Sequence, residues 1–136
     1  MSEIVYLDTS AVLRAVLERG LSPDVEGQLA DARFLVTSRL ALVESARAFA
    51  RLRSEGLPES QLTEAAQEAE SIWVRCTLWE LTPAVCDLAQ AIQPAQPLRT
   101  LDAIHLATWL LARRRLGADV ALVTSDLRLE AAARRV

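Results

Sequence analysis

The chain has 136 residues, of which 51% are hydrophobic and 24% are charged, and its formal net charge is −3. This is the length and composition of one globular domain, without a low-complexity segment. Proteins that hold long nucleic acids by bulk electrostatics are usually strongly basic, so we expect any nucleic-acid contact to be local. All 15 basic residues are arginine, and the absence of lysine excludes a phosphate loop ending in Gly-Lys-Ser/Thr and a lysine Schiff base.

Short apolar runs predict the strands of a sheet. They lie at residues 4–7, 34–37 and 120–124, with a weaker candidate at 77–81. The first three do not alternate polar with apolar side chains, which is typical of parallel strands that are covered on both faces.

Helical patterns separate the predicted strands. Thr82 followed by Pro83 is a strong helix start, and Pro94 and Pro97 break the chain before a helix that Gly117 ends. The alternation of strands and helices predicts an α/β fold with a small central parallel sheet, in a single domain over residues 1–136. The predicted helices lie at residues 10–19, 23–32, 40–54, 59–75 and 99–115, with short ones after Thr82 and near the C-terminus.

The two cysteines and the N-terminus bear on the cellular compartment. Cys76 and Cys86 are too far apart for a redox pair and lack partners for a zinc site, so we expect reduced thiols. The first residues carry no signal-peptide pattern, and no apolar run approaches the ~20 residues that span a bilayer. We therefore expect a cytoplasmic protein that does not contact a membrane.

Four acidic residues stand where an α/β fold places its ligands. Asp8 directly follows the first strand and Asp126 follows the last one. Glu44 lies in the helix after the strand at 34–37, and Asp102 lies in the first turn of the helix at 99–115. Because ligands bind outside the carboxyl ends of parallel strands, we expect these carboxylates to converge there.

Each acid taken alone also has a simpler interpretation. Asp8 and Asp126 could each cap the helix that follows. Asp102 could complement a helix dipole, and Glu44 could pair with an arginine on its own helix face. These alternatives stay open at the level of the sequence.

Taken together, the four acids indicate a metal site. Crowded carboxylates raise one another's pKa, and a divalent cation is the usual remedy. Oxygen ligands without histidine or cysteine suit Mg²⁺ or Mn²⁺. Such ions activate water and clamp the oxygens of an in-line phosphoryl displacement, so the predicted chemistry is phosphodiester hydrolysis.

For the histidine, the tryptophans and several arginines, the sequence predicts roles outside the metal site. His105 follows Asp102 by three positions, but we expect a buried, hydrogen-bonded side chain rather than a ligand. We expect the three tryptophans to pack in the core or an interface rather than to stack on bases. The tryptophans are Trp73, Trp79 and Trp109. The candidate phosphate contacts at the rim are Arg14, Arg47 and Arg51.

The order of short motifs resembles a known family. Leu-Asp-Thr-Ser-Ala stands at residues 7–11, a helical glutamate at 44, Leu-Asp-Ala-Ile-His-Leu-Ala at 101–107 and Thr-Ser-Asp-Leu-Arg-Leu at 124–129. Each motif is weak alone, but the four in this order resemble the PIN domain. A bare domain of this length is similar to the VapC toxins of bacterial type II toxin–antitoxin pairs.

The resemblance implies a fold, an activity and partners. PIN domains are metal-dependent ribonucleases with a small parallel sheet flanked by helices. VapC toxins cut structured RNA, often transfer RNA or ribosomal RNA at a loop. They usually form homodimers, and a VapB-like antitoxin holds them inactive.

The resemblance also assigns the site. It places the family's catalytic and metal-binding acids on Asp8, Glu44, Asp102 and Asp126, and a supporting hydroxyl on Thr124. Asp8 and Asp102 are the expected direct ligands, whereas Glu44 and Asp126 could act through water.

The leading hypothesis is therefore a Mg²⁺-dependent endoribonuclease toxin, with Mn²⁺ as the other candidate ion. Two alternatives remain. A catalytically inactive PIN-like module would bind RNA or protein without cutting. An aspartate-based phosphatase would use Asp8 as its nucleophile, but it wants a second acid where this chain has Ser10, and commonly a lysine.

Overall fold

The computed structural model describes residues 3–93 and 97–136, and its strands and helices alternate as the sequence predicts. Pro94, one of the two predicted breaks, lies outside the described residues. The elements in chain order are β1 (Ile4–Leu7), α1 (Thr9–Leu17), α2 (Pro23–Asp31), β2 (Phe34–Ser38), α3 (Leu40–Ser54), α4 (Glu59–Arg75), β3 (Cys76–Trp79), α5 (Pro83–Ala91), α6 (Thr100–Leu116), β4 (Val120–Val123) and α7 (Leu127–Ala133).

Local signals in the sequence account for several boundaries. The Thr82 hydroxyl accepts a hydrogen bond from the Val85 N–H and caps α5, with Pro83 in the first turn. Gly117 ends α6 at φ +59°, a left-handed conformation that glycine adopts without strain. The first strand has the predicted bounds, and the ends of the others differ from the predictions by at most two residues. The weaker candidate at 77–81 is confirmed as a strand, β3.

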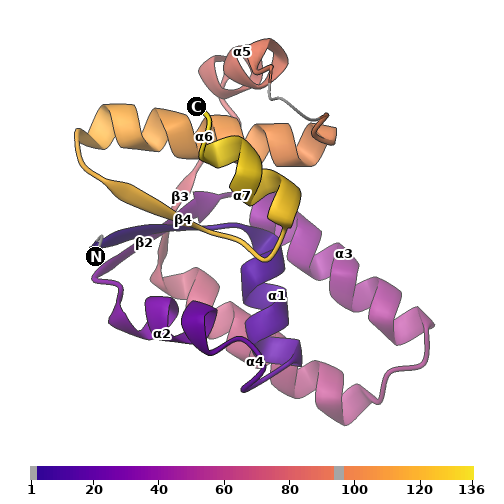
Figure 1. Cartoon of the computed structure of the whole chain (residues 1–136). Helices are drawn as coiled ribbons and strands as arrows, with labels where there is room; N and C mark the ends of the chain where they lie inside the picture. Colours follow the sequence, from indigo (N-terminus) through magenta and orange to yellow (C-terminus); the bar gives the residue numbers. More distant parts are fainter. Residues whose placement is uncertain (1–2, 94–96) are drawn as a thin grey trace.

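The strands form one parallel sheet in the order β3-β2-β1-β4. In Figure 1 the sheet lies between two layers of helices, with α1 to α4 on one face and α5 to α7 on the other. Successive side chains along a strand point to opposite faces of the sheet, so each strand contributes to both helical layers. Val5 and Leu7 pack with α1, α3 and α4, whereas Tyr6 and Val36 pack with α6 and α7. The sheet is therefore buried on both faces, as its unbroken apolar strands predict.

The tryptophans belong mainly to this packing. Trp73 and Trp109 are buried, and their indole N–H groups donate to the Ser45 hydroxyl and the Val120 carbonyl. The expectation of core packing is confirmed for these two, so neither is available to stack on bases or to cover a partner. Trp79 is half-buried, with the Arg115 guanidinium 5.7 Å from its ring centroid.

The two cysteines are free thiols and are both half-buried. Burial raises the pKa of Cys76 to about 11, although the nearby Arg75 charge acts in the opposite direction. The Cys76 thiol therefore stays protonated at neutral pH. Within residues 3–93 and 97–136, no helix has the length and apolar character needed to cross a membrane.

Parallel topology brings three segments to one edge of the sheet. β1 lies between β2 and β4, so the residues that follow each of these strands meet at their carboxyl ends. The Asp8 N–H donates to the Val123 carbonyl at 3.0 Å, and the Thr37 hydroxyl donates to the Leu7 carbonyl at 2.6 Å. These bonds fix the end of β1 against both neighbours, where the acidic site is built.

Candidate active site

Asp8 is the most enclosed acid of the site, with only 4% of its surface exposed. Its Oδ2 accepts hydrogen bonds from the Ser10 and Thr124 hydroxyls, each at 2.6 Å. Asp8 occupies the N-cap position of α1, a helix that the structure describes throughout, but its side chain makes no capping bond there. The cap interpretation is therefore wrong for this residue, and its carboxylate is oriented by hydroxyls instead.

The same hydroxyls tie the segment after β4 to the start of α1. Ser10 Oγ lies 3.2 Å from Thr124 Oγ1 and also accepts the Ser125 N–H at 3.0 Å. Thr124 Oγ1 accepts the Asp126 N–H at 3.0 Å. Thr124 thus contacts Asp8 directly, and Ser10 shares that task without having been predicted to do so.

Glu44 is held from the side of α1 and α6. Its Oε1 accepts the Thr9 hydroxyl at 2.7 Å and lies 2.6 Å from His105 Nε2. Burial acts to raise the pKa of Glu44, but the bond and charge of His105 and the bond from Thr9 outweigh it, so the pKa lies below its usual value. Among the described residues these partners hold Glu44, and an arginine of α3 does not.

His105 lies in the core next to two of the acids, Glu44 and Asp8. It is fully buried, and besides Glu44 its Nε2 lies 3.5 Å from Asp8 Oδ1. Its Nδ1 lies 2.7 Å from the Tyr6 hydroxyl. The expectation of a buried, hydrogen-bonded histidine is confirmed, but its partners are site residues. The position of His105 one helical turn after Asp102 was the signal in the sequence.

Asp102 lies in the first turn of α6 with its side chain 17% exposed. Burial raises its pKa, and the charges of Asp126 and then Asp8 raise it further. The charges of Arg99 and His105 oppose that rise without cancelling it; Arg99 Nε stands 3.8 Å from Asp102 Oδ2. Asp102 therefore shares one electrostatic field with two acids that are distant from it in sequence.

Asp126 combines two of the interpretations that the sequence left open. Its Oδ1 accepts the backbone N–H groups of Arg128 at 2.8 Å and Leu129 at 3.3 Å, so it caps α7. Its charge still acts on Asp102. Capping fixes this carboxylate beside the others.

The donor chemistry of the site fits a hard divalent cation. The acids offer only oxygen, and the pKa of Asp102 is raised first by burial and then by the charges of Asp126 and Asp8, both of which disfavour its ionised form. In the orientations that the side chains adopt here, however, the described residues include no group of three or more histidine, cysteine or acidic residues placed to hold a metal. Asp8, Asp102 and Asp126 are thus electrostatic neighbours rather than a closed set of ligands.

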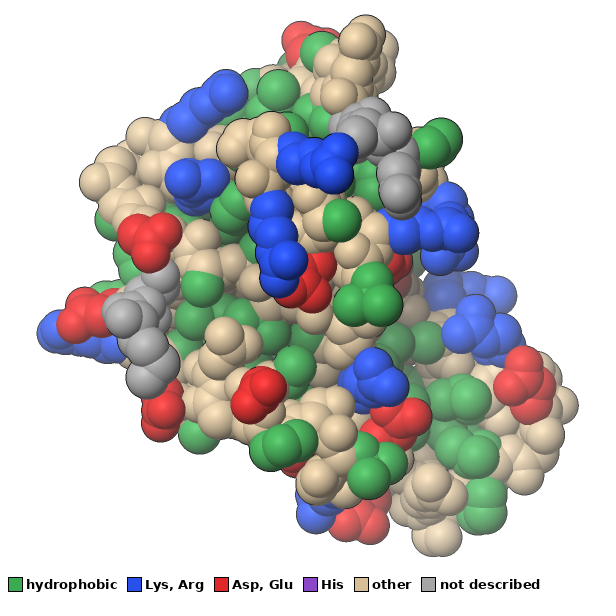
Figure 2. Space-filling model, in the orientation of Figure 1, with side chains coloured by type: hydrophobic (Ala, Val, Ile, Leu, Met, Phe, Trp, Pro, Cys, Tyr) green, Lys and Arg blue, Asp and Glu red, His purple; other side chains and the backbone are tan. Residues whose placement is uncertain are grey.

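An open hollow of about 760 Å³ borders Asp126. Its lining residues are Ser10, Arg99, Ser125, Asp126, Leu127 and Arg128. Figure 2 shows basic side chains beside acidic ones on the face that it presents. Arg99 and Arg128 were not among the predicted rim arginines, whereas Arg14, which was, forms an exposed ion pair with Glu18.

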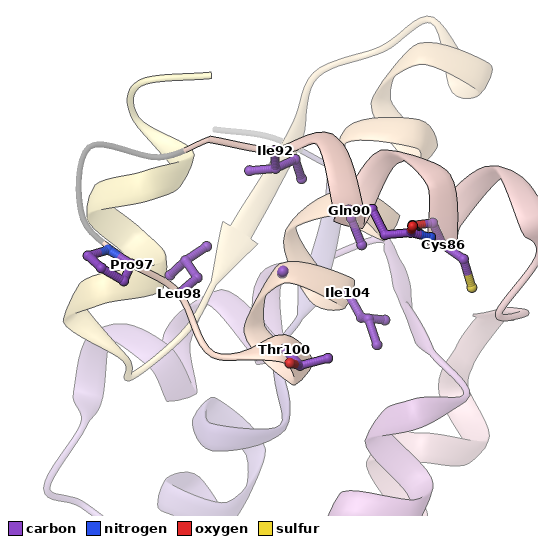
Figure 3. A pocket seen from close by; sticks show the side chains of 9 residues that line it. Cys86, Gln90, Ile92, Pro97, Leu98, Thr100 and Ile104 are labelled. Atoms are coloured by element: carbon purple, nitrogen blue, oxygen red, sulfur yellow. Dashed lines mark hydrogen bonds between the residues drawn. The ribbon is translucent and has the colours of Figure 1, made fainter.

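A separate apolar cavity of about 540 Å³ lies between α5 and α6. Figure 3 shows Cys86 and Gln90 of α5 and Ile104 of α6 among the side chains that line it. None of the four predicted acids contributes to this lining. The cavity is thus distinct from the acidic site.

Comparisons with known proteins agree with this arrangement. The PIN domain family model matches residues 5–135. Ribonuclease VapC35 of Mycobacterium tuberculosis is 35% identical over 132 residues, which are 96% of this chain and 90% of that protein. Ribonuclease VapC47 of the same species is 34% identical over 140 residues, 98% and 92% of the two chains. The crystal structure of PAE2754 from Pyrobaculum aerophilum has a similar fold, with a TM-score of 0.61, 18% identity and coverage of 93% and 78%.

We expect Asp102→Asn to increase the free energy of unfolding at neutral pH when a chelator is present. The folded-state pKa of Asp102 is raised, so ionising this carboxyl costs stability, and the cost appears as the pH rises from the unfolded-state pKa through the folded-state pKa. The advantage of the amide should shrink as the pH falls through the folded-state pKa and should be nearly gone at about 3.9, the unfolded-state pKa, below which the carboxyl is protonated in both states.

Urea unfolding of both proteins across this pH range measures the effect. Asp87→Asn, at an exposed position in α5, is the matched control. A loss of stability at neutral pH in Asp102→Asn would contradict the electrostatic description of the site.

Proposed function

The chain belongs to the PIN-domain family and is of the VapC type, and from that premise we propose that it is an endoribonuclease, the toxin of a type II toxin–antitoxin pair. The observation that carries the proposal is the shared field of Asp8, Asp102 and Asp126. These residues come from the beginning, the later part and the end of the chain, yet the charges of Asp8 and Asp126 both act on Asp102. Phosphodiester hydrolysis is the chemistry that such an oxygen-rich site supports best.

The cofactor in this proposal is Mg²⁺, with Mn²⁺ as the alternative. Asp8, Glu44, Asp102 and Asp126 would hold it, and Asp8 would use Oδ1, since two hydroxyls occupy its Oδ2. When bound, the ion supplies Lewis-acid chemistry and activates water for attack on phosphorus. The charge of the ion would also offset the repulsion that raises the pKa of Asp102.

The protein's own groups prepare the site before the substrate arrives. The Ser10 and Thr124 hydroxyls fix the orientation of Asp8, and the N-terminus of α7 fixes Asp126. Fixed carboxylates need no reorganisation when charge develops at the phosphate, which is the main electrostatic advantage of a folded active site.

Contacts to the RNA backbone must overcome an acidic surface. The chain has a net charge of −3, so binding depends on local positive charge. Arg99 and Arg128 line the hollow beside the acids and present planar guanidinium groups suited to phosphate. We propose that they hold the phosphates that flank the cleaved bond in a structured RNA, such as a transfer RNA or ribosomal RNA loop.

Partners complete the proposal. Each of three acids has an exposed apolar neighbour in sequence: Val43 beside Glu44, Leu101 beside Asp102 and Leu127 beside Asp126. Exposed apolar side chains bordered by polar groups are typical of surfaces that bind another protein. We propose that a VapB-like antitoxin covers this margin and blocks the acids, and that the toxin is a homodimer as its family implies.

We expect purified protein to cut cellular RNA into discrete fragments with Mg²⁺ or Mn²⁺, and chelator to stop the cleavage. Asp8→Asn and Asp102→Asn should each lower the rate by more than about 100-fold, because even the partners of metal ligands typically contribute 10–100-fold. Electrophoresis of transfer RNA and ribosomal RNA measures the products, and circular dichroism confirms that the variants fold.

Two outcomes would contradict the proposal. Full cleavage by both variants, or in chelator, would remove the acids and the metal from the mechanism. Intact RNA after incubation with folded, metal-loaded protein free of antitoxin would favour the non-catalytic binding module.

We expect Arg99→Ala and Arg128→Ala to weaken RNA binding and reduce its salt dependence. In the inactive Asp8→Asn background, each substitution should make the slope of log K against log salt shallower by about 0.7, the contribution of one phosphate contact on a single strand. Arg114→Ala, an exposed arginine near the other end of α6, is the control. An unchanged slope in both test variants would exclude these arginines from phosphate binding.

A further inference from the structure

A buried tyrosine and a buried histidine lie directly beneath the acids. Tyr6 of β1 and His105 of α6 are both fully buried, and their rings meet edge to face with centroids 5.9 Å apart. The proposed reaction assigns neither of them a role. His105 Nε2 nevertheless faces Glu44 Oε1 at 2.6 Å and Asp8 Oδ1 at 3.5 Å. His105 is thus in contact with two of the proposed catalytic acids, and Tyr6 reaches them only through His105.

The hydrogen bonds around His105 indicate which of its ring nitrogens carries the proton. Glu44 Oε1 lies 2.6 Å from His105 Nε2, and because a carboxylate oxygen can only accept, Nε2 is the nitrogen that donates. Nδ1 of the neutral ring then accepts, and its partner is the Tyr6 hydroxyl at 2.7 Å. A nitrogen that accepts a hydrogen bond is unprotonated, so the ring hydrogen belongs on Nε2. Nε2–H then donates to Glu44 Oε1, and each group in the chain has a consistent role.

We propose that Tyr6 and His105 are positioning residues: Tyr6 fixes the tautomer of His105, and His105 fixes the Glu44 carboxylate through Oε1. Thr9 donates to that same oxygen at 2.7 Å. Oε2 has no protein partner in residues 3–93 and 97–136, and it is the oxygen left to serve the reaction. The catalytic consequence rests on the proposed ribonuclease function, whereas the tautomer does not.

The other tautomer of His105, with its proton on Nδ1, would displace the acids as well as disturb the core. With the proton on Nδ1, the lone pair of Nε2 would face Glu44 at 2.6 Å and Asp8 at 3.5 Å. A lone pair repels carboxylate oxygen, so Glu44 would rotate away and lose its fixed position. Removing the Tyr6 hydroxyl, which does not touch either acid, should therefore disturb Glu44 through the ring.

The first arm of the test is spectroscopic, because His105 is the only histidine of the chain. In ¹⁵N-labelled protein without metal, long-range ¹H–¹⁵N correlation spectra at neutral pH should show Nε2 protonated and Nδ1 unprotonated. Tyr6→Phe should shift the ring toward the other tautomer or a mixture. A native ring protonated on Nδ1 or on both nitrogens, or a tautomer unchanged by Tyr6→Phe, would overturn the inference.

The second arm is kinetic. Tyr6→Phe should slow RNA cleavage about ten-fold, the lower range for the loss of a group that orients a metal ligand. In a Glu44→Gln background the same substitution should change the remaining rate by less than about two-fold, because residues that act through one group are not additive. Equal effects in both backgrounds would mean that Tyr6 acts only through the stability of the fold, which would overturn the inference.

Three further variants keep the kinetic test decisive. Ser45→Ala removes a buried hydrogen bond to Trp73 from the residue next to Glu44, and it should leave cleavage unchanged. If Tyr6→Phe does not fold, His105→Gln, which keeps an N–H donor, should retain more activity than His105→Met; equal activities would contradict the claim. If the native protein cuts no RNA, the proposed function fails, and the tautomer measurement still decides the positioning claim.

Discussion

Repulsion between carboxylates that are held at one edge of a parallel sheet is the constraint on which the rest of this site depends. Asp8, Asp102 and Asp126 reach that edge because β1 lies between its neighbours and α6 begins beside them. Burial and the two neighbouring charges raise the pKa of Asp102, so the folded chain carries an electrostatic cost there. Proteins keep such costs where function requires them and offset them elsewhere in the structure.

The four acids differ in the hydrogen-bond partners that the surrounding structure gives them. Asp8 receives two hydroxyls, Asp126 receives two backbone N–H groups of α7, and Glu44 receives His105 and Thr9. Within the part of the chain that the structure describes, the ion-pair partner of Asp102 is Arg99 at 3.8 Å, a contact too long for a hydrogen bond. Asp102 is therefore the acid that gains most from a cation, whereas the others are already oriented.

The sequence predicts the fold well because its signals are local. Apolar runs mark the strands, and Thr82 with Pro83 and Gly117 marks helix ends that the structure confirms. The proximity of Asp8 and Asp126 follows from their places just after two neighbouring parallel strands. Their partners did not follow, because the Ser10–Thr124 bridge joins residues 114 apart and the His105–Glu44 contact joins residues 61 apart. Such distant pairs are set by topology and side-chain packing rather than by periodicity.

The central claim is that a divalent cation relieves the repulsion at this edge of the sheet. Calorimetric titration of chelator-treated protein with Mg²⁺ or Mn²⁺, together with unfolding at rising metal concentration, tests it most directly. The account predicts saturable binding that increases the free energy of unfolding with metal concentration, since a ligand that binds only the folded state stabilises it. Asp102→Asn should weaken that binding strongly. A folded native protein that neither binds nor is stabilised by either ion would contradict the claim.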